Sequence, residues 1–340
     1  MKFAEKQSSK YWIDAVKAIC MLSVYLCHSE IYSNGDVHMC YALQGFYVNA
    51  FFVMSGYLLF WKMLDQKTEL GSEYFKKKMA NLATKLILPS IIFGVLLYIP
   101  KSLFHKGGLD LPTVLFNTLG GMNYWFISAL VVAEIAVLAI GCTCKWKNIW
   151  TYAAPILIVS AAGGYLCHLN TQTTLESHFP WFYKTGMVYT LFLLLGGLLN
   201  RYEEEYDRAM KYLFLPLLAL TIYILLSTWQ DKSALCFGLG GDFNIAGLVL
   251  SLCSISTVVT FCKKLDENKL LAFIGRNSIV FYFLSGALPA SLSTAVKPEC
   301  IKYGNLLFIV VAIVSTAIAF IATKLILKYA PFILGMQKKK

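Results

Sequence analysis

Long stretches without a charged residue recur along the chain, and they constrain its fold more than any other feature. A helix needs about 20 predominantly apolar residues to cross a membrane. Charged residues make up 14% of the chain, whereas an ordinary soluble domain contains roughly 25%. The pattern therefore predicts an all-α, polytopic helical bundle in a membrane. The stretches are Leu111–Ala133, Thr185–Asn200, Tyr212–Gln230, Phe243–Cys262, Asn277–Val296 and Tyr303–Thr323.

We expect about ten transmembrane helices, with both termini in the cytoplasm. The connections between the spans are short, and we find no soluble domain, repeat or linker among them. The sequence thus predicts one membrane-embedded domain over residues 1–340, which ends in a basic cytoplasmic tail at residues 335–340. The predicted spans are 12–32, 41–61, 79–100, 123–141, 149–168, 182–200, 210–229, 243–262, 270–296 and 303–330.

Lysine and arginine are distributed unevenly between the two predicted sides of the membrane. With the N-terminus in the cytoplasm, 20 of them lie in inside segments and 6 in outside segments. Cytoplasmic loops of membrane proteins carry such an excess of positive charge. The net charge of +11 is therefore mostly a sign of topology, and it does not indicate binding of nucleic acid.

The cysteines and glycines indicate neither a metal site nor a nucleotide site. The ten cysteines are scattered, and none has zinc-type spacing. We interpret them as small, inert hydrophobic residues. The glycine-rich segment Phe237–Asp242 lacks the Gly-Lys-Ser/Thr of a phosphate-binding loop, so a turn is the better interpretation.

The first predicted span carries three ionisable residues, Asp14, Lys17 and His28, on one face. Lys17 and His28 are 11 residues apart, which on a helix places them within about 20° of each other and about 16 Å apart along the axis. Asp14 precedes Lys17 by 3 residues, close enough to pair with it. This polar stripe begins at the cytoplasmic surface and continues into the membrane.

Two interpretations of the stripe remain open. In the structural one, Asp14 and Lys17 are interfacial, and His28 hydrogen-bonds a neighbouring helix. In the functional one, His28 takes and gives a proton, since an ionisable group at membrane depth indicates function by default. The depth of His28 favours the functional interpretation for that residue. The other histidines fall on the predicted outer side or at its edge: His38, His105, His168 and His178.

Five segments carry short motifs in a fixed order. They are "YWIDAVKAICMLSVYLCHS" (Tyr11–Ser29), "NAFFVMSGYLL" (Asn49–Leu59), "YFKKKMANLATKLILPS" (Tyr74–Ser90), "NYWFISALVVAE" (Asn123–Glu134) and "LAFIGRNSIVFYFLS" (Leu271–Ser285). This series resembles the membrane acyltransferase 3 family of integral membrane O-acyltransferases, over most of the chain.

Two positions depart from the pattern of that family. Lys17 stands where its members carry an arginine that is separated from the histidine by ten intervening residues, and lysine lacks the flat bidentate grip of arginine. Ser285 stands where members often carry a second histidine. His28 is therefore the one strong histidine candidate inside the predicted membrane region.

The resemblance implies a reaction. Members move an acyl group, usually acetyl, from cytoplasmic acyl-coenzyme A to a hydroxyl of a carbohydrate or lipid-linked glycan. Acyl-CoA, acetyl-CoA first, is thus the expected donor substrate, and no bound cofactor is expected. A sugar hydroxyl attacks poorly until a base takes its proton. His28 is the expected base, with Lys17 and Asp14 beside it; acylation of His28 itself is the alternative route.

Further residues of the motifs are candidates for supporting roles. We expect Lys78, Lys85 and Arg276 near the cytoplasmic mouth, where they suit the phosphates of the donor. Plain positive-inside anchoring is an equal interpretation for the lysines. In "GRNS", Gly275 permits a close approach of the backbone, and the next residues open a helix, whose N-terminus favours anions. The other pocket and supporting candidates are Asn277, Ser278, Ser55, Gly56, Trp125, Glu30, Glu134 and Tyr282.

Other classes of function stay open. Ionisable residues inside a ten-helix bundle also fit a transporter or a proton-coupled glycan or lipid carrier, although the sequence shows neither an inverted repeat nor paired broken helices of the usual transporter kind. A non-catalytic membrane scaffold explains the topology but not the ordered motifs. The expected location is a bacterial plasma membrane, with membrane lipid as a partner. The sequence identifies neither the acceptor nor the oligomeric state.

Overall fold

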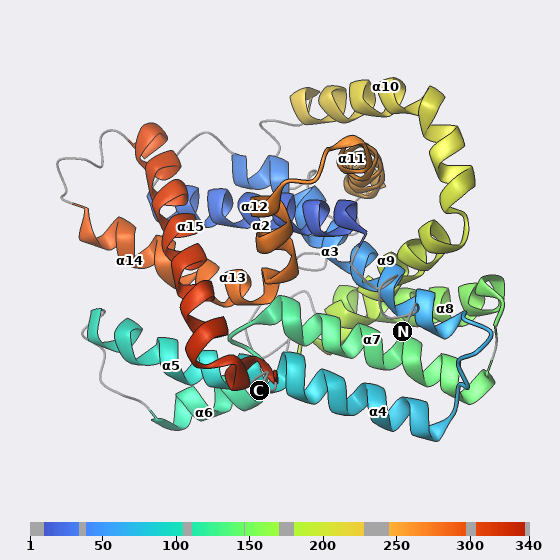
Figure 1. The fold of residues 1–340 in the computed structure, drawn as a ribbon, viewed down its shortest axis with the longest axis horizontal. Helices are drawn as coiled ribbons and strands as arrows, with labels where there is room; N and C mark the ends of the chain where they lie inside the picture. The colour runs from blue at the N-terminus through green and yellow to red at the C-terminus, as the bar shows by residue number, and fades with distance from the viewer. Residues whose placement is uncertain are drawn as a thin grey trace. The chain divides into compact units, whose positions relative to one another are not determined.

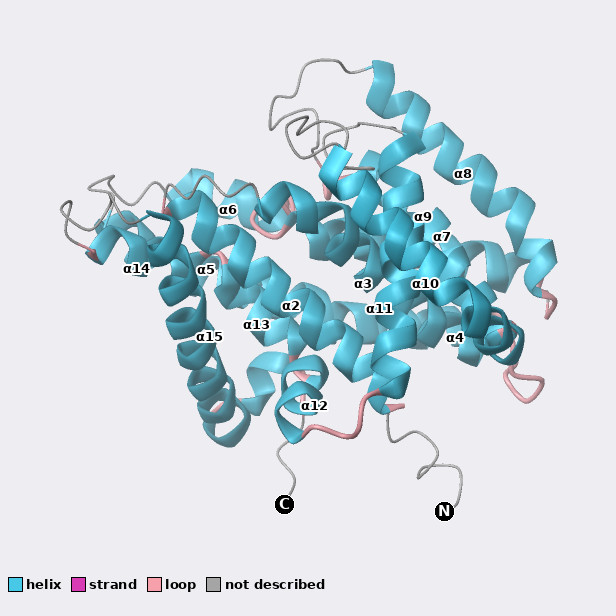
Figure 2. Cartoon of the chain, turned by 90° about the horizontal axis from the view of Figure 1, so that it is seen from above, coloured by secondary structure: helices cyan, strands magenta, loops and turns pink. Residues whose placement is uncertain are grey.

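The computed structural model describes residues 10–33, 39–104, 111–145, 147–169, 180–227, 245–296 and 304–336. Within these residues the chain is helical and contains no strand, as Figure 2 shows. The predicted all-α class is confirmed. His38, His105, His178, the segment Phe237–Asp242 and the end of the basic tail lie outside the described residues.

Eight of the ten predicted spans correspond to one α-helix each, because a long apolar run satisfies its backbone polar groups within its own helix. Their bounds differ from the predicted ones by a few residues, except that α10 begins seven residues earlier. The helices are α2 (Tyr11–Tyr32), α3 (Met39–Met63), α7 (Trp125–Cys144), α8 (Ile149–Leu169), α9 (Tyr183–Arg201), α10 (Glu203–Ser227), α11 (Ile245–Lys264) and α15 (Gly304–Tyr329).

The other two predicted spans are composite. Span 79–100 lies in α4 (Ser72–Leu82), the π-helix η1 (Ala83–Ile87) and α5 (Leu88–Phe104). Span 270–296 is divided into α12 (Lys269–Arg276), α13 (Ser278–Ser285) and α14 (Ala287–Ala295). Two short helices were not predicted, α6 (Leu111–Leu119) and the 3₁₀-helix η5 (Pro331–Leu334).

The number of membrane crossings stays a prediction. Among the described residues, 6 helices are long and apolar enough to cross a membrane, or 7 if the bent pair α13–α14 counts as one span. Helix α2 is not among them, although its 22 residues would suffice. It carries Asp14, Lys17 and Glu30, and such charges are costly at membrane depth.

The helices form two compact units. Unit 1 comprises Met1–Phe51, Glu204–Phe237 and Phe243–Leu325, and unit 2 comprises Phe52–Glu203, Gly238–Asp242 and Ile326–Lys340. Helix α3 therefore contributes its first half to unit 1 and its second half to unit 2. The single domain over residues 1–340 stays a prediction.

Helix α2 is the centre of unit 1. It packs against α11, α12, α13 and α14, and Figure 1 shows α12 directly against it. Small residues such as Ala15, Ala18 and Cys20 are fully buried on α2 and allow the neighbouring helices to come close. A Cβ atom added at Gly275 would overlap the backbone oxygen of Asp14, so the predicted close approach at Gly275 is confirmed.

Helix α9 organises unit 2. It packs against α7 and α8, and glycines let it approach the second half of α3. A Cβ atom at Gly56 would overlap the backbone of Leu193, and one at Gly196 would overlap the backbone oxygen of Val53. Ser55, beside Gly56, is half-buried. These small residues hold α3 and α9 at backbone contact distance.

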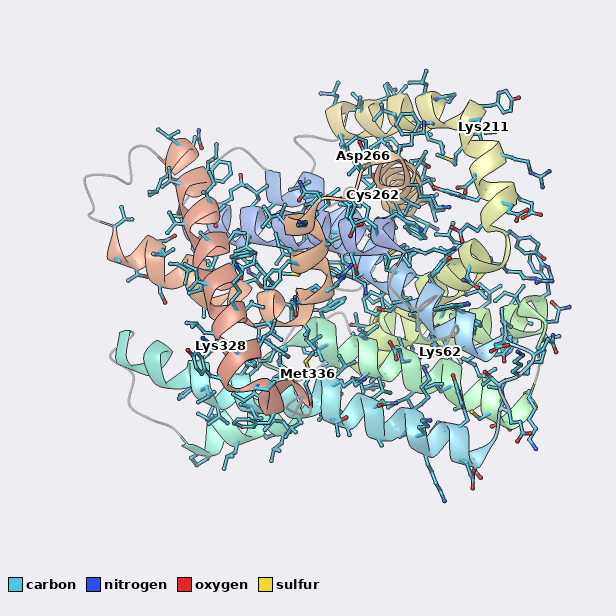
Figure 3. All side chains as sticks on the ribbon, viewed as in Figure 1. Lys62, Lys211, Cys262, Asp266, Lys328 and Met336 are labelled. Carbon is cyan, nitrogen blue, oxygen red and sulfur yellow. The ribbon has the colours of Figure 1, made fainter. Side chains whose placement is uncertain are left out.

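Exposed apolar side chains on α10 fit a surface in contact with lipid. Tyr212, Leu215 and Leu226 are all exposed, and Lys211 projects from the same helix, as Figure 3 shows. Cys262 on α11, labelled in the same view, is fully buried. The eight described cysteines are all free thiols.

The predicted sidedness can be tested on two exposed positions of unit 2. Lys67 follows α3 on the predicted inside, and Asn123 precedes α7 on the predicted outside. In a variant without native cysteines, a thiol reagent that cannot cross the membrane should label Asn123→Cys in intact cells and Lys67→Cys only after lysis. Labelling of Lys67→Cys in intact cells would contradict the topology in this region.

Candidate active site on helix α2

His28 is held on α2 by a backbone carbonyl of α13. Its Nδ1 atom lies 2.8 Å from the backbone oxygen of Ser285, and the side chain is half-buried. A carbonyl oxygen only accepts hydrogen bonds, so Nδ1 carries the proton and donates it. In the neutral imidazole this leaves the lone pair on Nε2. His28 is therefore set in the tautomer that can accept a proton through Nε2.

A second contact fixes α13 against α2 one turn away. The hydroxyl of Tyr25 donates to the backbone oxygen of Phe281 at 2.9 Å. The two rings also meet edge to face, with centroids 6.4 Å apart, a favourable geometry for aromatic pairs. Because Tyr25 and His28 each bind a carbonyl of α13, the orientation of the His28 ring relative to that helix is determined at two points.

An ion pair joins α12 to the N-terminal end of α2, which is the end predicted to face the cytoplasm. The Nε atom of Arg276 lies 2.9 Å from Oδ2 of Asp14. The Asp14 side chain is 4% exposed and that of Arg276 is 52% exposed. A buried carboxylate needs such a partner, since an unpaired charge is costly away from water. Asp14, expected beside Lys17, thus has a partner 262 residues away in the sequence.

The ion pair leaves part of the Arg276 guanidinium available. Arginine has five N–H donors, and the contact with Asp14 occupies the one on Nε. The terminal NH groups lie on a side chain that is half exposed, and they suit the bidentate binding of phosphate. Asn277 follows as the junction of α12 and α13; its amide donates to the oxygen of Phe273 at 2.8 Å. Helix α13 then begins at Ser278, where the sequence predicted a helix start.

The remaining candidates of unit 1 surround these two contacts. Lys17 is half-buried on α2, between Asp14 and His28. Glu30 is buried, and its Oε2 atom accepts the backbone N–H of Cys40 at 2.7 Å. That N–H belongs to the first turn of α3, so Glu30 acts as a cap for the helix. Tyr282 is half-buried on α13, and its ring lies beside that of Phe283.

Apart from Ser55 and Gly56 on α3, the candidates of unit 2 lie on α4, η1 and α7. The ammonium of Lys78 lies 5.6 Å from the ring centroid of Tyr74 and interacts electrostatically with Glu134 on α7. Lys85 is exposed within η1, and π-helical turns often mark functional sites. Trp125 begins α7 and contacts the rings of Phe126 and Phe182.

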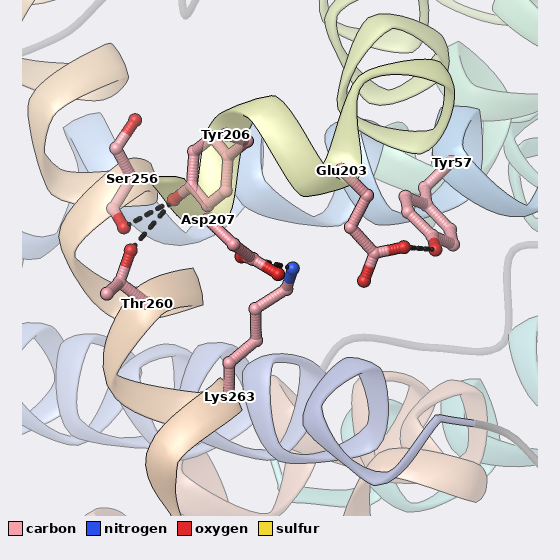
Figure 4. Close-up of polar contacts among 7 residues, drawn as sticks. All are labelled: Tyr57, Glu203, Tyr206, Asp207, Ser256, Thr260 and Lys263. Carbon is pink, nitrogen blue, oxygen red and sulfur yellow. Dashed lines mark hydrogen bonds and ion pairs between the residues drawn. The ribbon is translucent and has the colours of Figure 1, made fainter. Parts of the chain in front are cut away.

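Several polar contacts were not anticipated from the sequence, because they join residues that lie far apart along the chain. In unit 1, Lys263 on α11 forms an ion pair with Asp207 on α10 at 2.6 Å, and Tyr206 bonds the oxygen of Ser256 at 2.7 Å (Figure 4). In unit 2, the hydroxyl of Tyr57 donates to Glu203 at 2.6 Å. The structural interpretation expected His28 to hydrogen-bond a neighbouring helix, and it does so with α13. The partner itself, the Ser285 carbonyl, was not predicted, because a backbone carbonyl leaves no sign in a sequence.

Comparison with known proteins agrees with the motifs. The family model named acyltransferase 3, described as an acyltransferase domain, matches residues 10–324. No curated protein and no solved structure matches the chain significantly. The family match includes both the helix that carries His28 and the helices that contact it. The chain therefore belongs to the acyltransferase 3 family.

Proposed function

We propose that the protein is an integral membrane O-acyltransferase, with His28 as its general base. It transfers an acyl group, acetyl first, from cytoplasmic acyl-CoA to a hydroxyl of a cell-surface carbohydrate or lipid-linked glycan. The contact between His28 Nδ1 and the Ser285 oxygen, 2.8 Å long, carries the proposal. It leaves Nε2 ready to take the hydroxyl proton, and the family supplies the class of reaction.

The contact of Asp14 with Arg276 and the contact of His28 with Ser285 lie far enough apart along α2 to suit the two ends of the donor. Asp14 and His28 are 14 residues apart on one continuous helix, which corresponds to about 21 Å along its axis. Coenzyme A carries its phosphates at one end and the thioester at the other. Arg276, anchored by Asp14, binds phosphate at the cytoplasmic end, and the thioester extends along α2 towards His28. Lys17 lies between them and adds positive charge along this path.

The chemical step balances with His28 alone as the proton acceptor. Nε2 removes the proton from the acceptor hydroxyl, and the hydroxyl oxygen attacks the thioester carbonyl. The tetrahedral intermediate collapses and the carbon–sulfur bond breaks. The departing coenzyme A thiolate takes the proton from Nε2, which leaves a new ester on the glycan, free coenzyme A thiol and a neutral His28. Direct transfer needs no second nucleophile, and we prefer it to a route in which His28 itself is acylated.

The proposal places the reaction in a bacterial plasma membrane, a location that the family suggests, with lipid around the apolar helices. Within unit 1, Glu30 and Tyr282 support the helices around His28. Within unit 2, Lys78 and Lys85 add positive charge on the predicted cytoplasmic side, and Trp125, Ser55, Gly56 and Glu134 are the candidates for lining or supporting the passage of the donor in that unit.

Label transfer in the purified protein tests this proposal. The protein is incubated with acyl-CoA labelled in the acyl group and with a panel of envelope glycans. We expect an acyl ester on one class of glycan and an equal amount of free coenzyme A thiol. Hydrolysis or retention of the thioester with every acceptor, under conditions where the protein is folded, would contradict the proposal.

One observation favours a carrier as the second candidate. Helices α13 and α14 are bent by 41° at their break, and discontinuous helices form the substrate sites of many transporters. A carrier would move the glycan or its lipid across the membrane of vesicles that contain the purified protein, without forming an ester. Ester formation that depends on acyl-CoA, with no acceptor movement when acyl-CoA is absent, would exclude simple carriage.

The donor role of Arg276 gives a kinetic prediction. Arg276→Ala should raise the KM for acyl-CoA by about 10- to 100-fold, as expected for the loss of a hydrogen bond between charged groups. The KM for the acceptor should stay close to its normal value. Initial rates at varied donor and varied acceptor separate the two effects.

Two further variants make this prediction specific. Arg276→Ala removes one partner of the buried Asp14 carboxylate, so the double variant Asp14→Asn, Arg276→Ala also removes that negative charge. Arg208→Ala is the matched control, because the Arg208 side chain is 70% exposed and forms its ion pair with Glu205, one turn earlier on the same helix. A defect confined to the acceptor KM would remove Arg276 from the donor site.

A further inference from the structure

The helix that supplies the carbonyl for His28 is broken just after that carbonyl. Helix α13 ends at Ser285, α14 begins at Ala287, and the two are bent by 41°. Pro289 lies in the first turn of α14 and is buried there. It is 4 residues after Ser285, the spacing at which a helical carbonyl normally finds its donor.

The chemistry of proline explains both the bend and the carbonyl. Proline has no backbone N–H, so residue 289 cannot donate to the oxygen of Ser285. Its ring also clashes with the carbonyl four residues earlier, which bends a helix at that point. In a buried setting an unsatisfied carbonyl is costly. The Ser285 oxygen therefore needs a donor from outside its own helix.

His28 provides that donor. Its Nδ1 atom lies 2.8 Å from the Ser285 oxygen, and α14 and α13 both pack against α2. We propose that Pro289 is a positioning residue for His28: by withholding an N–H from the Ser285 carbonyl, it reserves that oxygen for Nδ1 and so keeps the Nε2 lone pair free. The catalytic consequence rests on the proposed function, whereas the tautomer of His28 does not.

Helix α2 and the neighbouring carbonyl strengthen this assignment. The oxygen of Phe281, one turn before Ser285, is bound by Tyr25 at 2.9 Å. The two side chains of α2 thus bind carbonyls 4 residues apart on the same helix. The residue four positions after Phe281 is Ser285, which has a backbone N–H, whereas the residue four positions after Ser285 is Pro289, which has none. Because position 289 is proline, no backbone N–H at that position competes with His28 for the Ser285 oxygen.

The test compares two substitutions at position 289 that differ by one N–H group. Pro289→Ala introduces an amide donor that competes with His28 for the Ser285 oxygen. Replacement of Pro289 by lactic acid, the hydroxy-acid analogue of alanine, gives a backbone ester with the same side chain and no N–H. Both variants remove the proline ring, and at the Ser285 carbonyl they differ in the presence of the competing N–H donor. The ester also weakens the Leu288 carbonyl as an acceptor, which does not bear on the tautomer of His28.

The first readout is the tautomer of His28 in the full-length protein, by NMR of ¹⁵N-labelled histidine, with His28→Gln to assign the signal. The wild type and the lactate variant should show a neutral ring protonated at Nδ1. Pro289→Ala should show a mixture of tautomers or protonation at Nε2. An unchanged Nδ1–H tautomer in Pro289→Ala, or the same change in both variants, would overturn the inference.

The second readout is acyl transfer. Loss of the partner that orients a metal-bound imidazole typically lowers activity by about 10- to 100-fold, and we take the same scale for His28. We expect a fall of this size in kcat for Pro289→Ala, with little change in the KM for acyl-CoA, and recovery in the lactate variant. Absence of transfer in the wild type would contradict the proposed function only, and the tautomer comparison would still decide the role of Pro289.

Discussion

Replacement of His28 by glutamine should lower the kcat for acyl transfer by about 10²–10⁴-fold, the usual contribution of a general base. Glutamine keeps a polar side chain that can donate to the Ser285 carbonyl, 2.8 Å from Nδ1 in the native protein. It has no nitrogen that takes a proton near neutral pH. The protein should therefore fold, insert and bind acyl-CoA, and only the transfer step should fail. Rates at saturating donor and acceptor, on matched amounts of folded protein, measure the effect.

Controls separate chemistry from structure. His168→Gln is the matched substitution, since His168 is an exposed histidine at the end of α8. His28→Ala removes the contact with Ser285 as well, so it should lose stability in addition to activity. Near-normal transfer by His28→Gln over several pH values would defeat the assignment of His28 as the base. A loss that follows the amount of folded protein would leave His28 with a structural role.

The second large effect is expected at Gly275, where α12 meets α2. A Cβ atom at this position would overlap the backbone oxygen of Asp14, so one of the two helices must move in Gly275→Ala. Overpacking of a close contact typically costs about 1–3 kcal/mol. The shift would also disturb the 2.9 Å contact between Asp14 and Arg276 on the next residue. We expect a lower melting temperature in detergent and a higher KM for acyl-CoA.

Gly286 provides the matched control on the same stretch of chain. It lies between α13 and α14 in a right-handed helical conformation, and a Cβ atom there would meet no other atom within 4 Å. Alanine is favoured over glycine in a helix by about 1 kcal/mol, so Gly286→Ala should keep or raise the melting temperature. An equal melting temperature for Gly275→Ala and the wild type would show that α12 does not contact α2 as closely as described.

Hydropathy predicted the helical segments well because each one is a long apolar run that forms its own hydrogen bonds. It did not predict where helices break. Span 270–296 is uniformly apolar over most of its length, yet the chain is interrupted at Asn277 and Gly286. Pro289 was visible in the sequence, but a hydropathy pattern does not register a missing N–H. The π-helix at Ala83–Ile87 has no comparable sign in the sequence.

Only the local geometry of the candidate site, within one helix or next to one residue, was predictable from the sequence. The helical period placed Asp14, Lys17 and His28 on one face, and the glycine before Arg276 indicated a close approach that the structure confirms. The partners across the bundle were not predictable in this way. Asp14 meets Arg276 and His28 meets Ser285 through separations of 262 and 257 residues. Such contacts are set by tertiary packing, which one sequence without aligned relatives does not reveal.

A single-turnover reaction of the purified protein tests the central claim most directly. Protein loaded with one equivalent of acyl-labelled coenzyme A thioester is mixed with the acceptor, quenched at intervals, and the label is followed on coenzyme A, protein and glycan. In the wild type we expect label to leave coenzyme A only when acceptor is present, and to appear on the glycan as an ester at the same rate. In His28→Gln we expect the label to stay on coenzyme A. Equal transfer rates in the wild type and His28→Gln, or acceptor that crosses a vesicle membrane while the thioester stays intact, would contradict the central claim.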